Sequence, residues 1–429
     1  MRAEDAGHRD TSPLDNVECD MSTLERLRAA SFSLFGLVAC LLTLPGPVFG
    51  QALPGAAAST WTDIVADWRS QVREQGVVGS SIGLVRGGDF AALETEGMAD
   101  LASGRAVDDE TIYHWASITK TFTAIAIMQL RDDGLLSLDD PIVEYVPELR
   151  DVHNEFGSME EITIRHLMSH SAGFRGGTWP YAGGELWHPH EPTEWSQLVS
   201  MIPYTQIHFE PGSRYSYSNP GIIFLGLVIE KVSGDVFEAY IDKNIFRPLG
   251  MSRAYFDVTP RALRQHRSNH YTIRDGRPEP GGLDFNTGIT VSNGGLNAPV
   301  PDLGRYLAFL LGTPWGDAGT DAYEAVLARS SLEEMWGSVV PIGDNPMGDA
   351  SMGLSYFLYD KDGHRVIGHT GTQRTFYSFF YVDPASGTGV VAAFNTGAGD
   401  ETGPDTNGIR VDISARVVNE LFPSLRGGR

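Results

Sequence analysis

Segments with strand character stand near both ends of this 429-residue chain, whereas its middle is helical and rich in loops. The strand segments are apolar runs bounded by glycine or proline turns; they are Ser80–Arg86, Phe90–Glu96, Arg365–His369, Thr375–Val382 and Thr388–Asn395. The pattern predicts an α/β (α+β) fold, with one antiparallel sheet built from both chain ends, flanked by helices, and an α-rich insertion. We expect the sheet to come from residues 59–110 and 353–425, and the helical region from residues 111–352.

Apolar residues at helical spacing predict several helices. Ser59–Gln75 has the pattern of an amphipathic helix, and Gly408–Leu421 that of a closing helix. Gly221–Ile229 is apolar but far too short to span a membrane, which indicates a buried helix. Thr163 is typical of an N-cap. The glycine- and aromatic-rich segment from Phe174 to His190 is either a solvated loop or a wall of a substrate site.

The charge of the chain excludes two kinds of partner. A formal net charge of −23 argues against nucleic acid, which usually needs a basic face, and against docking on an anionic membrane surface. The only two cysteines, Cys19 and Cys40, precede residue 51. A mature chain starting near Gln51 therefore has no cysteine for a disulfide, a metal site or catalysis.

Residues 1–50 have the pattern of an upstream segment followed by a secretory signal peptide. Two arginines precede the apolar run from Ser31 to Leu44, and small residues follow near Gly50. The polar, acidic stretch before it suggests that Met21 rather than Met1 is the true start. We therefore predict an exported protein, periplasmic or extracellular, with residues 51–429 as a single domain and no transmembrane span in the mature chain.

Lipid anchoring is the alternative for this segment. Leu37-Val38-Ala39-Cys40 resembles a bacterial lipoprotein cleavage box. The apolar residues that follow Cys40 count against it, so cleavage as an ordinary signal peptide is preferred.

The set Ser117-Ile118-Thr119-Lys120 stands where an apolar-periodic helix begins. Residues three apart lie on one helical face, so the Ser117 hydroxyl and the Lys120 amine should meet near the positive end of the helix dipole. A hydroxyl is a poor nucleophile until a base takes its proton, and a desolvated lysine can do so. The pattern indicates acyl transfer through a covalent serine intermediate, although one such motif also arises by chance.

Two more sets follow it in order: Tyr217-Ser218-Asn219 in a loop and His369-Thr370-Gly371 on a predicted strand. With these, the sequence resembles the serine β-lactamase and penicillin-binding protein superfamily, specifically its class C (AmpC-like) branch. The resemblance runs from about Val78 to Leu421 and includes Ser292–Leu296. It implies the β-lactamase/transpeptidase-like fold and a single hydrolase domain over residues 51–429.

The resemblance also implies a role for each motif residue. Ser117 would be the acylated nucleophile and Lys120 its base. Tyr217 would be a second general acid/base, a role that a phenol can fill if nearby cations lower its pKa. Asn219 would hold Lys120 and bind the carbonyl group of the substrate.

The strand motif would complete the site. Backbone N–H groups of Ser117 and Thr372 would form the oxyanion hole. Thr370 and Gly371 would line the strand edge, where Gly371 lets the substrate approach. His369 departs from the lysine that β-lactamases carry for the substrate carboxylate, because histidine is mostly neutral at pH 7.

Three functions stay open at this point. We prefer a secreted serine hydrolase acting on small amides or esters, such as D-amino-acid peptides or short acyl esters. Hydrolysis of β-lactams is the alternative, and a non-enzymatic binder of cell-wall fragments is the alternative from another class. Whether the acyl group passes to water or to an amine is not distinguishable from sequence.

No cofactor is expected. No metal is expected either, because His166 and His170 lack the glutamate of a His-Glu-x-x-His site.

Overall fold

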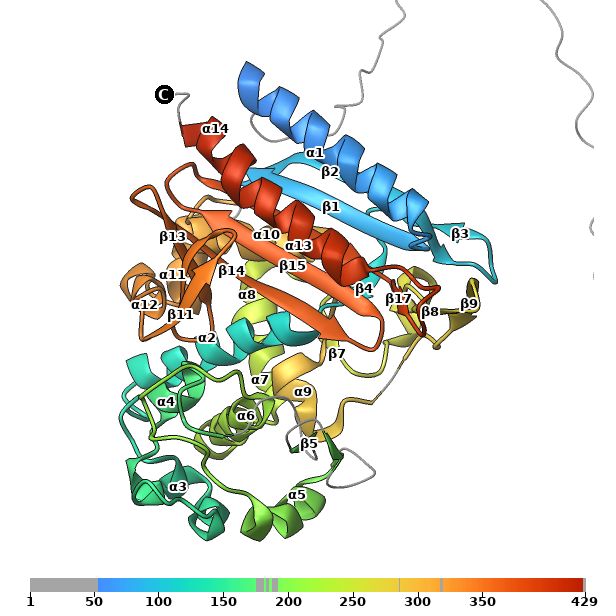
Figure 1. Cartoon of the computed structure of the whole chain (residues 1–429). Helices are drawn as coiled ribbons and strands as arrows, with labels where there is room; N and C mark the ends of the chain where they lie inside the picture. The colour runs from blue at the N-terminus through green and yellow to red at the C-terminus, as the bar shows by residue number, and fades with distance from the viewer. Residues whose placement is uncertain are drawn as a thin grey trace, which may run out of the picture. The chain divides into compact units, whose positions relative to one another are not determined.

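The computed structural model describes residues 53–174, 181–182, 185–186, 192–284, 286–316 and 319–426, and the fold is described for these residues. Its main sheet has nine antiparallel strands in the order β11-β12-β13-β14-β15-β16-β1-β2-β3. In this sheet β1 (Gly79–Arg86) pairs with β16 (Thr388–Phe394) on one side and with β2 (Asp89–Asp100) on the other. The prediction that both chain ends build one sheet is confirmed (Figure 1).

Both faces of the central strands are covered. Along β16, Val391 and Ala393 belong to the core on the helical side, whereas Val390 and Phe394 belong to the core beneath the terminal helices. Because successive side chains of a strand point to opposite faces, a strand buried on both faces is a continuous apolar run rather than an alternating one.

The two chain ends also cover one face of the sheet together. Helix α1 (Gly55–Glu74) and helix α13 (Thr406–Arg416) run beside each other across this face (Figure 1). A salt bridge from Arg426 to the buried Asp383 (2.8 Å) ties the last helix to the end of β15. The predicted N- and C-terminal helices are therefore confirmed.

Helix α2 (Thr119–Asp132) lies on the other side and is almost entirely buried. It packs against α6 (Asn219–Ser233) and α9 (Val291–Gly294), while α10 (Val300–Leu311) lies against β16 and β1. The apolar segment predicted as a buried helix forms the core of α6. This environment matters because residues at the start of α2 are desolvated on all sides.

Shorter elements complete the described chain. The helices are α3 (Ile142–Tyr145), α4 (Ile164–Met168), α5 (Trp195–Met201), α7 (Phe237–Ile241), α8 (Arg247–Leu249), α11 (Thr320–Val326), α12 (Arg329–Met335) and α14 (Phe422–Arg426). The strands are β3 (Arg105–Ala106), β4 (Ile112–His114), β5 (Tyr181–Ala182), β6 (Glu185–Leu186), β7 (Tyr255–Phe256), β8 (Tyr271–Arg274), β9 (Arg277–Pro280), β10 (Leu296–Pro299), β11 (Val340–Asn345), β12 (Gly348–Met352), β13 (Phe357–Lys361), β14 (His364–Gln373), β15 (Phe376–Asp383) and β17 (Thr396–Ala398).

The predicted limits of the sheet need one correction. The C-terminal part of the main sheet begins with β11 at Val340 and not at residue 353. Only Val340 is buried in β11, which also contains Pro341 and Gly343, so this edge strand has no apolar periodicity to detect. Small sheets such as β4-β10-β7 also lie within the region predicted as helical.

In the part of the chain that the structure describes, no helix combines the length and the apolar character needed to cross a bilayer.

Thr163 caps α4 as predicted, and its hydroxyl accepts a hydrogen bond from the backbone N–H of His166.

The packing of α1 gives a test of the fold. Trp68 is fully buried, and its indole N–H donates to the Ser80 hydroxyl at 3.1 Å. We expect Trp68→Ala to lower the free energy of unfolding by about 3–5 kcal/mol, because it leaves a large cavity under the terminal helices. Urea unfolding would measure this loss. The matched control is Val411→Ala on the exposed side of α13, which should stay within about 0.5 kcal/mol of the parent.

Candidate active site

Ser117 lies on a sharp bend at the start of α2. A single 3₁₀ turn, Ala116–Ile118, leads into the helix, and Ala116 has a left-handed backbone with a φ of 50°. Every other residue from 111 to 120 is buried, whereas Ser117 is partly exposed. The bend therefore presents one hydroxyl at the surface of an otherwise closed segment.

Lys120 is completely buried directly behind this hydroxyl. Its Nζ lies 3.0 Å from Ser117 Oγ and donates to the Asn293 carbonyl oxygen at 2.7 Å. Burial lowers the pKa of the Lys120 ammonium well below its usual 10.5. A neutral amine can donate to Asn293 and still turn its lone pair to the Ser117 hydroxyl, as a general base requires.

Tyr217 approaches the same pair from the loop before α6. Lys120 Nζ lies 5.0 Å from the centre of the Tyr217 ring. Burial raises the pKa of the Tyr217 phenol, and its hydrogen bond with Ser117 and the charge of Arg410 only partly oppose that rise. In the free protein the nearby cations therefore do not lower the pKa of this phenol below its usual 10, and the phenol keeps its proton.

Asn219 is the first residue of α6, but it is not seen holding Lys120. Its Oδ1 is buried and has no hydrogen-bond partner among the described residues. The contact to the lysine comes from Asn293, whose side-chain amide donates to the Asn219 carbonyl oxygen at 3.4 Å. Sequence reasoning assigned no role to Asn293, because this residue contacts Lys120 through its backbone.

Strand β14 brings the third motif to Ser117. The Trp115 carbonyl oxygen accepts a hydrogen bond from Ser378 on β15, and a Cβ added at Gly371 would come within 2.2 Å of the same oxygen. The glycine is thus required by the backbone next to the nucleophile, in addition to the expected approach of a substrate. Thr372 follows it and is exposed.

Thr370 lies on a different surface from the rest of its motif. It lines a small hollow of about 170 Å³ together with Tyr359, Tyr381 and Arg410. The guanidinium of Arg410 donates to the Gly371 carbonyl oxygen (3.1 Å) and to the Thr372 hydroxyl (3.0 Å), which fixes the end of β14. Sequence reasoning missed Arg410, since an isolated arginine in a helix carries no signal.

His369 is buried with a neutral ring. Its Nδ1 lies 2.7 Å from the Thr370 carbonyl oxygen, so Nδ1 carries the proton and Nε2 is an acceptor. Nε2 has no partner within the described structure. Burial, assisted by Lys120, lowers the pKa of His369 to about 3. The residue cannot supply the positive charge that a lysine would supply here.

His114 is a second residue that sequence reasoning missed. Its Nδ1 lies 3.0 Å from Asn297 Oδ1 on β10, and its Nε2 lies 3.0 Å from Gln373 Oε1 at the end of β14. The imidazole therefore connects the segment before Ser117 to the strand that carries the third motif.

The two histidines considered as metal ligands, His166 and His170, have other contacts. His166 accepts the Thr163 backbone N–H in the capping box of α4, and His170 packs on Tyr217 with 4.4 Å between ring centres. Within the described residues no three His, Cys, Asp or Glu side chains are grouped to hold a metal ion.

Some predicted features lie outside the described residues. Most of the predicted loop from Phe174 to His190 lies outside the described residues, as do the signal segment and Cys40.

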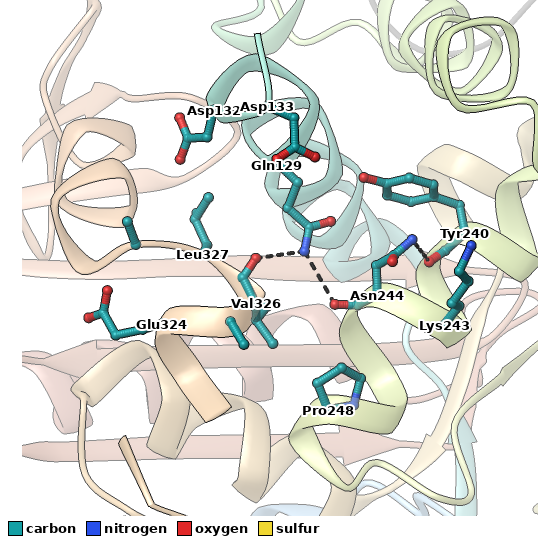
Figure 2. Close-up of a pocket in the computed structure, with 12 residues that line it drawn as sticks. Gln129, Asp132, Asp133, Tyr240, Lys243, Asn244, Pro248, Glu324, Val326 and Leu327 are labelled. Atoms are coloured by element: carbon teal, nitrogen blue, oxygen red, sulfur yellow. Dashed lines mark hydrogen bonds between the residues drawn. The ribbon is translucent and has the colours of Figure 1, made fainter. Parts of the chain in front are cut away.

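A larger hollow of about 320 Å³ lies at the opposite end of α2 (Figure 2). Gln129 stands in its wall and donates to the Val326 and Asn244 carbonyl oxygens. Gln129 is nine residues beyond Lys120, which is about 14 Å along a helix. None of the motif residues lines this hollow.

The geometry agrees with the comparison to known proteins. The Beta-lactamase family matches residues 63–414, most of the chain, so the chain belongs to this family. The superfamily resemblance and the fold class are confirmed. A solved class C β-lactamase has the same fold, with a TM-score of 0.68 and 18% identity over 86% of this chain and 99% of that chain.

Two curated relatives are more similar in sequence. Protein flp of Staphylococcus aureus is 26% identical over 74% of this chain, which spans 60% of the length of flp. Esterase EstB of Burkholderia gladioli is 27% identical over 85% of this chain and 97% of its own length.

The neutral state of His369 predicts a pH dependence of stability. Below pH 6.5 this histidine becomes protonated in the unfolded chain. In the folded chain its pKa is about 3, so it stays neutral there. Wild-type stability should therefore fall, relative to His369→Gln, by up to about 1.4 kcal/mol per pH unit as the pH drops from 6 toward 4. Urea unfolding of both proteins at pH 7, 6, 5 and 4 measures the difference. Parallel curves would contradict a neutral buried imidazole.

Proposed function

We propose that this protein hydrolyses small amides or esters through an acyl-enzyme, with Ser117 as nucleophile. The observation that carries this proposal is the contact of Ser117 Oγ with Nζ of the buried Lys120 at 3.0 Å, where burial lowers the pKa of the ammonium. Preferred substrates are D-amino-acid peptides and short acyl esters. The name of the relative EstB supports an ester substrate.

The protons move in a defined order in this proposal. Lys120 takes the Ser117 proton as Oγ attacks the carbonyl carbon, and the backbone N–H groups of Ser117 and Thr372 receive the developing oxyanion. Tyr217, which is protonated at rest, donates to the leaving alkoxide or amine, and Lys120 returns its proton to the phenolate. Water then attacks the acyl-enzyme by the same steps in reverse order. Asn219 binds the substrate carbonyl group.

His369 supports substrates without a carboxylate. A neutral acceptor next to the site attracts neither the carboxylate of a β-lactam nor that of a peptide terminus. Hydrolysis of β-lactams therefore remains the alternative rather than the main proposal.

Export to the periplasm or the extracellular space is part of the proposal. It rests on the apolar run from Ser31 to Leu44 with small residues near Gly50. Anchoring as a lipoprotein at Cys40 is the competing possibility, and mass spectrometry of the mature N-terminus separates the two.

Matched esters test the substrate class. We expect Ser117-dependent hydrolysis of p-nitrophenyl butyrate, which is uncharged, to exceed that of p-nitrophenyl hemisuccinate, which has a carboxylate at the far end. His369→Lys should raise the hemisuccinate/butyrate ratio of kcat/KM about tenfold, roughly 1.4 kcal/mol, by adding a cation. The ratio is independent of how much variant is folded.

Two further substrates separate the alternatives. D-Alanine p-nitroanilide reports a D-peptidase, and a chromogenic cephalosporin reports a β-lactamase. Fast cephalosporin turnover would favour the β-lactamase function instead. No difference between the wild type and Ser117→Ala on any substrate would overturn the proposed nucleophile.

The role of Lys120 predicts a pH–rate profile. Only the neutral amine can accept a proton, so kcat/KM for p-nitrophenyl butyrate should rise with pH and reach its plateau well below 10.5. Lys120→Met should lower kcat by about 10²–10⁴ and remove this rising limb. Initial rates are measured from pH 5 to 9, and the background rate of Ser117→Ala is subtracted at each pH. A Lys120→Met profile with the same rates and the same shape as that of the wild type would contradict the assignment of Lys120 as the base.

A further inference from the structure

His170 has a strained backbone conformation. Its φ of 54° is left-handed, which is unfavourable by about 1–2 kcal/mol for a residue with a side chain. The residue is 1% exposed and lies just after α4. Such strain persists where surrounding contacts hold the residue, and here those contacts involve Tyr217.

Two hydrogen bonds from the Tyr217 loop end on His170. The backbone N–H of Ser216 donates to the His170 carbonyl oxygen at 2.8 Å, and the backbone N–H of Ser218 donates to its Nδ1 at 3.2 Å. These are the amides on either side of Tyr217. The main chain before and after the phenol is therefore fixed by one residue.

The imidazole ring also contacts the phenol directly. The two ring centres are 4.4 Å apart at an angle of 33°, and Phe357 on β13 stacks nearly parallel to Tyr217 at 6.4 Å. The same imidazole lies 6.2 Å from Tyr215, at almost a right angle. His170 and Phe357 therefore both pack on the Tyr217 ring.

The hydrogen bond from Ser218 also determines the tautomer. Nδ1 accepts, so the proton of the ring sits on Nε2, which is buried without a partner among the described residues. Burial and the nearby Lys120 lower the pKa of His170 well below 6.5, so Nδ1 is an acceptor at neutral pH.

We propose that His170 is a positioning residue that holds Tyr217 at the Ser117–Lys120 pair through its Nδ1 acceptor, its carbonyl oxygen and its ring. The strained bend after α4 is the means by which both the carbonyl oxygen and the ring reach one loop. This inference rests on the proposed role of Tyr217 as a proton donor.

Three substitutions separate the contacts of His170. His170→Phe keeps a ring but removes the acceptor, His170→Asn keeps an acceptor and tolerates a left-handed backbone, and His170→Ala removes both. We expect His170→Phe to lower kcat for p-nitrophenyl butyrate 10- to 100-fold with KM changed less than about threefold. His170→Asn should keep at least ten times the kcat of the alanine variant. His364→Phe, at an exposed position on β14, is the matched control and should stay within twofold of the parent.

A double-mutant cycle distinguishes positioning from general structural damage. If His170 acts through Tyr217, His170→Phe should change kcat less than twofold when it is added to Tyr217→Phe. Thermal unfolding of each variant checks that it is folded. Costs that multiply fully in the double variant would overturn the proposal, because they would show that His170 acts independently of the phenol.

A measurement without turnover keeps the inference testable if the proposed function fails. Incorporation of [ζ-¹³C]tyrosine gives a signal for Tyr217 that Tyr217→Phe identifies. We expect this signal to shift or split in folded His170→Phe and to stay unchanged in His364→Phe. Absence of Ser117-dependent turnover in the parent would refute the proposed function alone. An unchanged Tyr217 signal in His170→Phe would refute the clamp.

Discussion

The antiparallel pairing of β1 with β16 is the constraint on which the rest of the molecule depends. It joins segments about three hundred residues apart, with Ser80 opposite Phe394, and places one strand from each half of the chain side by side inside the sheet. Closing so long a loop costs entropy, which the two apolar cores on either face of these strands must offset. The pairing of β16 with β15, and of β15 with β14, then carries the His369 motif to the start of α2.

Desolvation determines the chemistry at the point where these elements meet. Burial lowers the pKa of Lys120 and of His369, and it raises the pKa of Tyr217. In all three groups burial thus favours the uncharged form. Protons can then pass between neighbouring groups without the creation of an isolated buried charge, which is costly in a low dielectric.

The sequence predicted the order of the elements and the three motifs because each has a local signal. Examples are the apolar face of α1, the threonine cap of α4 and the spacing of Ser117 and Lys120. The edge strand β11 and the contacts of Asn293, His114 and Arg410 were not predicted. These depend on backbone atoms or on partners distant in the chain, which no local pattern reports. The charge state of His369 likewise depends on burial that only the fold supplies.

Ala116 illustrates how such a site gives up folding stability to hold its nucleophile in position. Its left-handed backbone holds the hydroxyl of the next residue clear of a segment that is otherwise buried, and this geometry is paid for in folding free energy. A glycine there would relax the bend and would also let it adopt other shapes. The bend is therefore a place where selection for heat resistance and selection for catalytic speed would favour different residues.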